Sequence, residues 1–197
     1  MTSNITNVCV FASSSNSLDN IYYEAARELG ALIAKEGFNL IYGGSRRGSM
    51  WICAEAAKNN NGRVVGIMPE RIAYTFKCSN PEDCDEFYLT AGMRERKALL
   101  DEKSDAVIAI AGGFGTLEEV SEMIVQKQLG YNNKPIVFLN TNGFYNNLFK
   151  FFEDTFEQHF ANQEARNLYY IASTPQEAIN HIKNYVPLEL TDKYVYK

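Results

Sequence analysis

The stretch Ala106-Val-Ile-Ala-Ile-Ala-Gly-Gly-Phe-Gly-Thr-Leu-Glu-Glu119 places an apolar run directly before a glycine-rich turn and a helical pattern. Ala106–Ala111 has the length and composition of a buried strand. The glycines of residues 112–115 predict a turn, and Thr116 opens a helical pattern that reaches about Leu129. A buried strand that leads through glycines into a helix is typical of a parallel βα unit.

Short apolar runs alternate with helical patterns on both sides of this unit. The other predicted strands are Val8–Phe11, Asn39–Tyr42, Val64–Met68, Pro135–Leu139 and Tyr169–Ala172. The other predicted helices cover about 19–36, 48–58, 92–103, 144–158 and 175–185. Residues 70–88 are the least regular stretch and predict a long excursion from the sheet. The alternation predicts an α/β fold, a Rossmann-like doubly wound parallel sheet with helices on both faces, in a single domain over 1–186 with a tail over 187–197.

The composition predicts a cytoplasmic globular protein. The 197 residues are 46% hydrophobic and 22% charged, which is enough apolar material for a core. The net charge of −5 comes from mixed acidic and basic residues, whereas nucleic-acid binders usually present a basic stripe. Residues 1–7 lack the features of a signal peptide, and no apolar run approaches the roughly 18 residues of a membrane span. We therefore expect neither a nucleic-acid nor a membrane partner.

The four cysteines are expected to be reduced and non-catalytic. Cys9 lies in a predicted strand and Cys53 in a predicted helix, where a thiol usually packs as a small apolar group. Cys78 and Cys84 flank a polar loop without the spacing of a metal site, and the chain has only two histidines. We expect no bound metal and no cofactor.

In a doubly wound sheet, the loops from strand to helix lie at one edge, where ligands bind against helix N-termini. The segments placed there are Ser13–Ser15, Gly43–Gly48, the helix start at Gly92, and Gly112–Thr116. Neither glycine-rich turn reads as a Walker or a dinucleotide-binding motif, so a single phosphate fits best. An equal alternative to phosphate binding is that these glycines only allow the tight bend between strand and helix.

The segment Gly112–Glu119, with Met93-Arg94-Glu95-Arg96-Lys97 and Gly43-Gly44 upstream, resembles the LOG (Lonely Guy) family of cytokinin riboside 5′-monophosphate phosphoribohydrolases, many of which carry the label lysine decarboxylase. The three motifs occur in family order over roughly residues 6 to 185. The resemblance implies a homodimeric, metal-free enzyme with its site near the dimer interface. Such an enzyme splits a nucleoside 5′-monophosphate into free base and ribose 5-phosphate.

On the family pattern, Arg96 and Glu119 match the catalytic pair. The other residues expected at the substrate or its phosphate are Ser14, Gly44, Gly48, Arg94, Lys97, Gly112, Gly113, Gly115 and Thr116. The departures from the pattern are Ser45 for a glycine, Trp51 in the second glycine motif, Arg94 for a histidine and Ala111 for a proline. These departures bear on base specificity more than on nucleotide binding.

Several of these residues have local alternatives. Thr116 and Glu119 have the spacing of a capping box. Lys97 and Asp101 have the i, i+4 spacing of an ordinary surface pair. Arg96 lacks a carboxylate at helical spacing, which favours a distant partner such as Glu119 or a ligand. Ser13–Ser15 could simply cap the first helix.

Aromatic and basic residues elsewhere leave two interpretations open. The phenylalanines of 144–156 favour core and dimer packing over base stacking. Tyr74 and Phe76 could line a base pocket or pack under their own loop. Arg46 and Arg47 sit in a glycine loop, where an exposed position is somewhat more expected than a ligand contact.

Two other functions compete with the LOG-type activity. One is a general AMP or GMP nucleosidase, and the other is a non-catalytic nucleotide-binding carrier or sensor on the same fold. Pyridoxal chemistry is disfavoured, because the sequence offers no recognisable Schiff-base lysine with a partner for the ring nitrogen.

Overall fold

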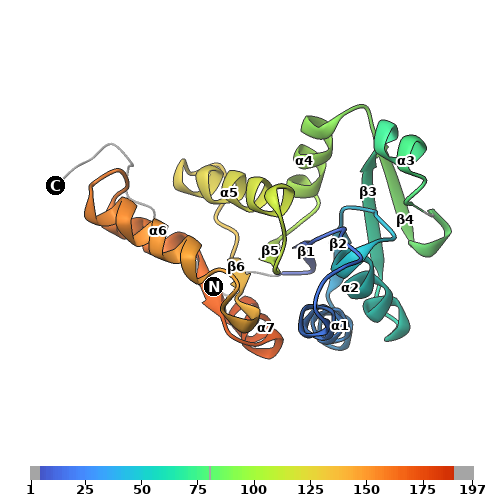
Figure 1. The fold of residues 1–197 in the computed structure, drawn as a ribbon, viewed down its shortest axis with the longest axis horizontal. Coiled ribbons are helices and arrows are strands. Elements are labelled where there is room, and N and C mark those ends of the chain that lie inside the picture. The colour runs from blue at the N-terminus through green and yellow to red at the C-terminus, as the bar shows by residue number, and fades with distance from the viewer. Residues whose placement is uncertain (1–4, 80, 189–197) are drawn as a thin grey trace.

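The computed structural model describes residues 5–79 and 81–188. One sheet contains the strands β1 (Asn7–Phe11), β2 (Asn39–Tyr42), β3 (Val64–Pro69), β4 (Glu86–Thr90), β5 (Ala106–Ala109), β6 (Ile136–Leu139) and β7 (Tyr170–Ala172). Their order is β4-β3-β2-β1-β5-β6-β7, and each neighbouring pair is parallel (Figure 1). The predicted Rossmann-like doubly wound sheet is confirmed. Residues 189–197, most of the expected tail, lie outside the described residues.

Helices cover both faces of this sheet. They are α1 (Asn20–Lys35), α2 (Gly48–Asn59), α3 (Glu70–Phe76), α4 (Met93–Glu102), α5 (Phe114–Gln128), α6 (Asn146–Glu157) and α7 (Pro175–Lys183). Short 3-10 turns follow at Pro81–Asp83, Thr141–Gly143 and Gln163–Leu168. The helices α1, α2 and α7 lie on one face, and α4, α5 and α6 lie on the other (Figure 1). None of the described helices is both long and apolar enough to cross a membrane.

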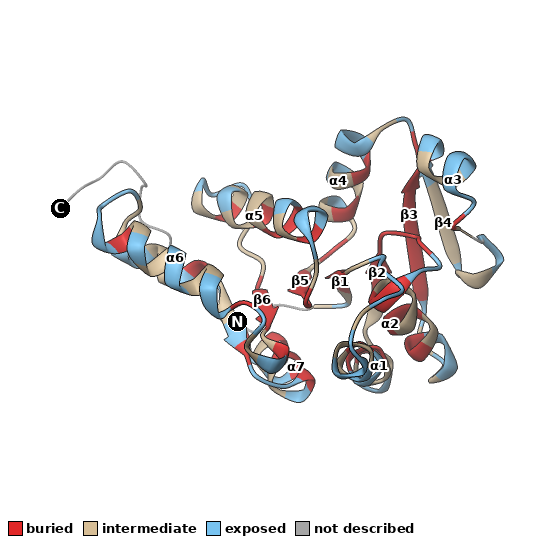
Figure 2. Cartoon of the chain, in the orientation of Figure 1, coloured by how far each residue is buried: buried red, intermediate tan, exposed pale blue. Residues whose placement is uncertain are grey.

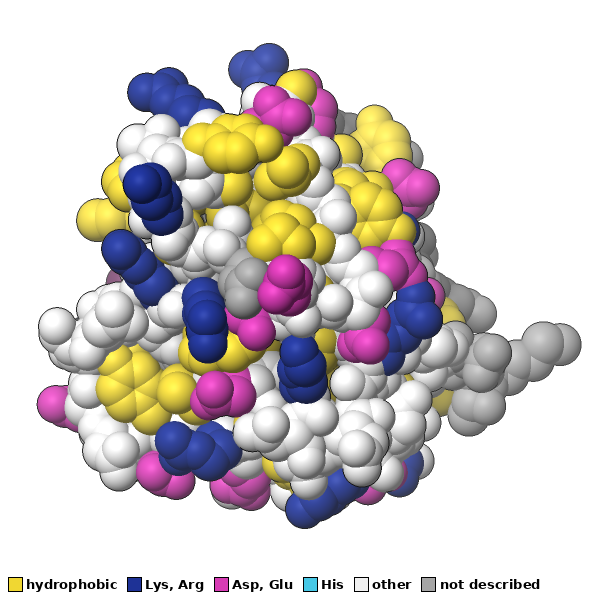
Figure 3. Space-filling model, turned by 90° about the vertical axis from the view of Figure 1, so that its right-hand side faces the viewer, with side chains coloured by type: hydrophobic (Ala, Val, Ile, Leu, Met, Phe, Trp, Pro, Cys, Tyr) yellow, Lys and Arg dark blue, Asp and Glu magenta, His cyan; other side chains and the backbone are white. Residues whose placement is uncertain are grey.

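The two faces of the sheet carry separate apolar cores because successive strand residues point to opposite sides. In β1, Val8 and Val10 pack with α1, α2 and α7, whereas Cys9 and Phe11 pack with α4, α5 and α6. Buried residues accordingly follow the strands and the inner stripes of the helices (Figure 2). On the outer surface at the β4 end, basic and acidic side chains are intermixed (Figure 3).

The expectation that residues 70–88 are irregular is wrong at both ends of the stretch. Glu70–Phe76 forms α3, and β4 begins at Glu86. The strand β4 is an edge strand that pairs with β3, and four of its five residues are only partly buried or exposed. The helix α3 has no buried residue. Both elements therefore lack the strong apolar periodicity from which sequence assignments are made.

Close packing of α1 against α2 depends on one glycine. A Cβ built on Gly30 would lie 2.0 Å from the carbonyl oxygen of Cys53, which is backbone and cannot rotate away. Both helices border the loops after β1 and β2, so this contact sets the spacing of two loops at the carboxyl edge of the sheet.

We expect Gly30→Ala to lower the free energy of unfolding by about 1–3 kcal/mol, the usual cost of forcing extra volume into a packed interior. Urea denaturation measures the change. The matched control is Gly115→Ala, also inside a helix, where a Cβ would meet nothing within 4 Å and no loss is expected. Equal unfolding free energies for Gly30→Ala and wild type would contradict this packing.

Candidate active site

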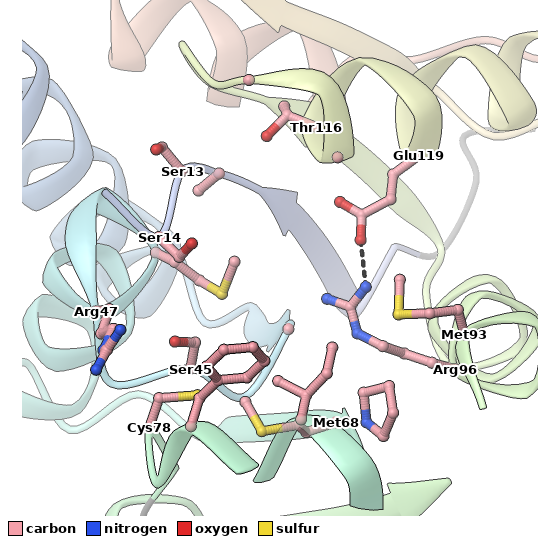
Figure 4. A pocket seen from close by; sticks show the side chains of 18 of the residues that line it. Ser13, Ser14, Ser45, Arg47, Met68, Cys78, Met93, Arg96, Thr116 and Glu119 are labelled. Carbon is pink, nitrogen blue, oxygen red and sulfur yellow. Dashed lines mark hydrogen bonds and ion pairs between the residues drawn. The ribbon is translucent and has the colours of Figure 1, made fainter. Parts of the chain in front are cut away.

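A cavity of about 540 Å³ opens at the carboxyl edge of the sheet. Its walls come from the segments after β1, β2 and β3 and from the first turns of α4 and α5 (Figure 4). The predicted site residues that line it are Ser14, Arg96, Gly113, Gly115, Thr116 and Glu119. Segments about 100 residues apart in the sequence therefore meet around one space, as the carboxyl-edge rule predicts.

Arg96 and Glu119 form a buried ion pair in the wall of this cavity. Arg96 Nη1 donates to Glu119 Oε1 at 2.5 Å, and the side chains are 8% and 7% exposed (Figure 4). Arg96 Nε also donates to the carbonyl oxygen of Ile67 at 3.2 Å. The distant carboxylate partner expected for Arg96 is therefore Glu119, and the end of β3 orients the guanidinium.

Burial dominates the electrostatics of Glu119. It raises the pKa of the carboxyl above its ordinary value, because desolvation disfavours the charged form. The charge of Arg96 and its hydrogen bond lower the pKa and partly offset this effect, and the nearby Glu118 raises it again. Glu119 is thus a carboxylate held in a poorly solvated place by one cation.

Gly43 provides the room for the guanidinium. A Cβ at this position would lie 2.3 Å from Arg96 Nη2 and 3.0 Å from Met50 Sδ. A side chain on residue 43 would therefore push Arg96 away from its present position. This steric requirement explains a glycine at the end of β2 without any phosphate contact.

The loop before α5 leaves its glycines open to the cavity. Gly113 is the N-cap of α5, and an added Cβ at Gly113 or Gly115 would meet nothing within 4 Å. Chain packing therefore does not require glycine at either position. The first turn of a helix presents unpaired N–H groups and the positive end of the helix dipole, which suits an anion. The buried Thr116 lies in the same turn and also lines the cavity.

The remaining predicted site residues lie outside the described lining of this cavity. Gly44 and Gly48 have φ angles of +72° and +61°, so both are required by the backbone of the loop. A Cβ on Gly48 would also lie 2.4 Å from the carbonyl oxygen of Ser13. Gly112 lines a smaller neighbouring cavity of about 250 Å³, which shares Ser13 and Gly113 with the main one.

Two more predicted site residues outside the cavity lining, Arg94 and Lys97, lie on α4. Arg94 is exposed on α4. Lys97 forms ion pairs with Glu118 and with Glu122, the latter at 2.7 Å. The expected pairing of Lys97 with Asp101 is wrong, because Asp101 pairs with Lys134 at 2.5 Å.

The two capping roles considered as alternatives do not occur. The helix α5 begins at Phe114, so Thr116 lies inside its first turn, and Glu119 spends its carboxylate on Arg96 rather than on a capping box. The helix α1 begins at Asn20, beyond the serine loop. Ser13 instead binds α2, since its carbonyl oxygen accepts from Met50 N at 3.1 Å.

The wall opposite the glycine loop is largely apolar, and sequence reasoning missed most of it. It contains Met50, Met68, Pro69, Ile72, Phe76, Cys78 and Met93. Met68 and Pro69 end β3, so the carboxyl-edge rule could have found them. Phe76 lines the cavity, as one interpretation expected, whereas Tyr74 is 69% exposed and is not among the lining residues described.

The two loop arginines point to different surroundings. Arg47 lines the cavity. Arg46 pairs with Asp83 at 3.3 Å and lies over the ring of Trp51 at 5.3 Å, so its charge is already used. Trp51, on α2, is partly buried and packs against the core on the face of the sheet that α1, α2 and α7 cover.

All four cysteines are free thiols. Burial raises the pKa of Cys53 to about 12 and also raises the pKa of Cys9, so neither forms a reactive thiolate near neutral pH. Across residues 5–79 and 81–188, no group of three or more His, Cys, Asp or Glu side chains is arranged to hold a metal ion.

The chain is similar in sequence to a family of known proteins. A family model described as "Possible lysine decarboxylase" matches residues 50–182. The probable cytokinin riboside 5′-monophosphate phosphoribohydrolase LOGL2 of Oryza sativa subsp. japonica is 37% identical over 180 residues, which cover 91% of this chain and 73% of LOGL2. LOG1 of Arabidopsis thaliana, a cytokinin riboside 5′-monophosphate phosphoribohydrolase, is 36% identical over 180 residues, covering 91% and 84%.

Solved structures show the same fold. A molybdenum cofactor binding protein from Rippkaea orientalis matches with a TM-score of 0.69 at 28% identity, over 91% of this chain and 96% of that one. The family model spans more than half of the chain, and both curated relatives match over most of their own length. The resemblance seen in the sequence motifs is therefore confirmed, and the chain belongs to the LOG family, whose model is described as "Possible lysine decarboxylase".

Proposed function

We propose that this protein is a nucleoside 5′-monophosphate phosphoribohydrolase that releases a free base and ribose 5-phosphate. The observation that carries the proposal is the buried Arg96–Glu119 pair in the wall of a cavity that also contains the N-terminal turn of α5. A carboxylate and an anion-binding turn face the same space. This matches a substrate with a phosphate at one end and a glycosidic bond nearby.

The substrate phosphate binds at the loop from Gly112 to Thr116. Gly113 and Gly115 have open space where a side chain would stand, so a ligand can approach the backbone closely. The N–H groups of the first turn of α5 and the Thr116 hydroxyl act as donors. Ser14, on the loop after β1, lies across the cavity and closes this polar end.

The base occupies the apolar end of the cavity. Met50, Met68, Ile72 and Met93 offer flexible or branched apolar surface, and Phe76 adds an aromatic ring. A planar purine with an apolar substituent fits such a wall better than a bare polar base. We infer from this lining that the preferred substrate is a cytokinin riboside 5′-monophosphate, the substrate class named for the curated relatives.

Hydrolysis at C1′ develops positive charge on the ribose ring. Glu119 stabilises this oxocarbenium-like state and orients the attacking water, whose oxygen forms the new bond to C1′ as the bond to the base nitrogen breaks. The water loses one proton as it bonds to C1′, the departing base gains one, and the other product is ribose 5-phosphate with a hydroxyl on C1′. Arg96 keeps Glu119 ionised and in place.

We further propose a cytoplasmic homodimer with the site near the interface. Exposed apolar side chains on and after α5 and on and after α6 supply a surface that would be covered in a dimer. They are Val125, Leu129, Tyr131, Phe151 and Phe160. Phe114, 93% exposed, lines the cavity itself, so the mouth of the site is also apolar. The four free thiols fit a reducing compartment.

Purified protein incubated with AMP, GMP, CMP and isopentenyladenosine monophosphate should release base fastest from the last, measured by chromatography of base and ribose 5-phosphate. Glu119→Gln and Arg96→Ala should each lower kcat/KM by about 10²-fold or more, the usual contribution of a positioned acid–base group. Binding without base release from any of the four substrates would favour the carrier or sensor. Preference for AMP or GMP would favour a general nucleosidase.

The matched controls are Glu118→Gln, one residue along α5, and Arg27→Ala on the surface of α1, both of which should retain wild-type rates. Glu118 is exposed and pairs with Lys97, and Arg27 pairs with Glu24. Circular dichroism checks that each variant folds, because removal of one partner leaves a buried charge unpaired. Full activity of folded Glu119→Gln would overturn the assignment of Glu119.

The Glu119 carboxyl should titrate above 4.5, the ordinary value, and its pKa should rise further in Arg96→Met, because Arg96 opposes the effect of burial. Carbon-13 NMR of labelled carboxylates, assigned with Glu119→Gln, measures both midpoints without substrate. Base release should fall as the pH drops through the wild-type midpoint.

The raised pKa of Glu119 also makes stability depend on pH. The stability that protonated Glu119 contributes is present below the pKa of the unfolded chain and is lost as the pH rises through the pKa of the folded protein. A midpoint at or below 4.5, or a downward shift in Arg96→Met, would contradict this electrostatic account.

A further inference from the structure

A second cavity, of about 440 Å³, lies at the other end of α5 from the active site. The cavity lies at the amino edge of the sheet, because its lining includes Lys127, from the last turn of α5, and Ile136, the first residue of β6. Eight residues separate Lys127 from Glu119, which is about 12 Å of rise along a helix. The cavity is also lined by Tyr170, His181 and Tyr185.

Lys127 is a buried cation without an acidic partner among its hydrogen-bond acceptors. The residue is 1% exposed, and its Nζ donates to the carbonyl oxygen of Lys134 at 2.9 Å and to Tyr185 Oη at 2.8 Å. Within residues 5–79 and 81–188, these two acceptors are neutral, whereas an ammonium group has three donors. Burial lowers the pKa of Lys127 to about 8, so the amine is still mainly protonated at pH 7.

The other basic groups of this cavity do not add a free charge. Arg166 Nε lies 2.9 and 3.1 Å from the two carboxylate oxygens of Glu153, so the guanidinium is already neutralised. His181 stacks on Tyr170, with ring centroids 4.0 Å apart and planes 7° apart. Burial and the charge of Lys127 lower the pKa of His181, so its imidazole is neutral at pH 7. Among the described residues, one positive charge without an acidic partner, on Lys127, therefore lies in the wall of a cavity that also has aromatic side chains.

We propose that this cavity is a binding site for a small aromatic monocarboxylate, separate from the active site. The carboxylate takes the third donor of Lys127 and supplies the missing negative charge. The ring packs against the stacked surface of Tyr170 and His181 and the ring of Tyr185. A monoanion matches the one cation without an acidic partner that residues 5–79 and 81–188 place here, whereas a phosphate dianion calls for a second cation.

Two features of the cavity support a real ligand site. An ammonium group that is buried without a counter-ion costs free energy, and an anion that binds beside it recovers part of that cost. The ring of Tyr185 lies 4.9 Å from Lys127 Nζ, and Tyr185 Oη also donates to Asn133 Oδ1 at 3.0 Å. The amine is thus held in place by its neighbours, so little side-chain entropy is lost on binding.

Isothermal titration of the full-length protein with benzoate tests the proposal, with benzamide as the neutral analogue of the same shape. We expect one benzoate per chain, and an affinity about tenfold or more above that of benzamide, because a charge-assisted hydrogen bond is lost with the charge. Equal affinities for benzoate and benzamide, or no benzoate binding at millimolar concentrations, would overturn it.

The variant Lys127→Met keeps the length of the side chain and removes the charge, so benzoate binding should weaken by about tenfold or more. Lys183→Met is the matched control: Lys183 lies on α7 like His181, but its amine pairs with Glu36 at 2.6 Å outside the cavity. Circular dichroism reports whether both variants fold. Benzoate binding that persists unchanged in folded Lys127→Met would also overturn the proposal, whatever the outcome for the proposed hydrolase.

Discussion

A guanidinium and a carboxylate buried side by side at the edge of the sheet tie three segments of the chain together. Arg96 comes from α4, Glu119 from α5, and the carbonyl oxygen of Ile67 from β3. Burial of each charge carries a desolvation cost that the other charge offsets in large part, so neither helix can slide along the sheet without leaving one of the two charges unpaired. The geometry of the cavity follows from this constraint, because both helices begin at its rim.

The two ends of the cavity differ in how they are held. At the polar end, the loops after β1 and β2 are linked directly: Gly48 N donates to Asn16 Oδ1 at 2.9 Å, and Ser49 Oγ bonds to Ser13. At the apolar end, α3 contributes exposed or half-buried residues and has no buried contact of its own. The polar end is therefore held in place before any ligand binds, whereas the apolar end rests on a helix without buried residues and can adjust more easily.

The sequence was sufficient to predict β1, β2, β3, β5 and β6, because these strands are short apolar runs buried on both faces of the sheet. It failed at β4 and α3, where an edge position and solvent exposure leave no clear period. Arg96 and Glu119 were singled out by family resemblance, and their mutual contact was one of the alternatives considered, because Arg96 has no carboxylate at helical spacing on α4. For Gly44 and Gly48 the sequence left a backbone role and a phosphate role equally open, since a glycine needed for a positive φ and one needed for a phosphate look the same in a sequence. The partners of Lys97 depended on the distance between α4 and α5, which local spacing does not contain.

The missing side chain at Gly43 has a consequence for how this family can vary. The space that a Cβ would need there is filled by Arg96 Nη2, a group from a residue 53 positions later in the sequence. The two positions are therefore coupled: alanine at 43 would displace the guanidinium of Arg96, and without that guanidinium only the thioether of Met50, 3.0 Å from the added Cβ, would still have to shift. A lineage that lost the arginine would thereby lose the tightest steric constraint on residue 43.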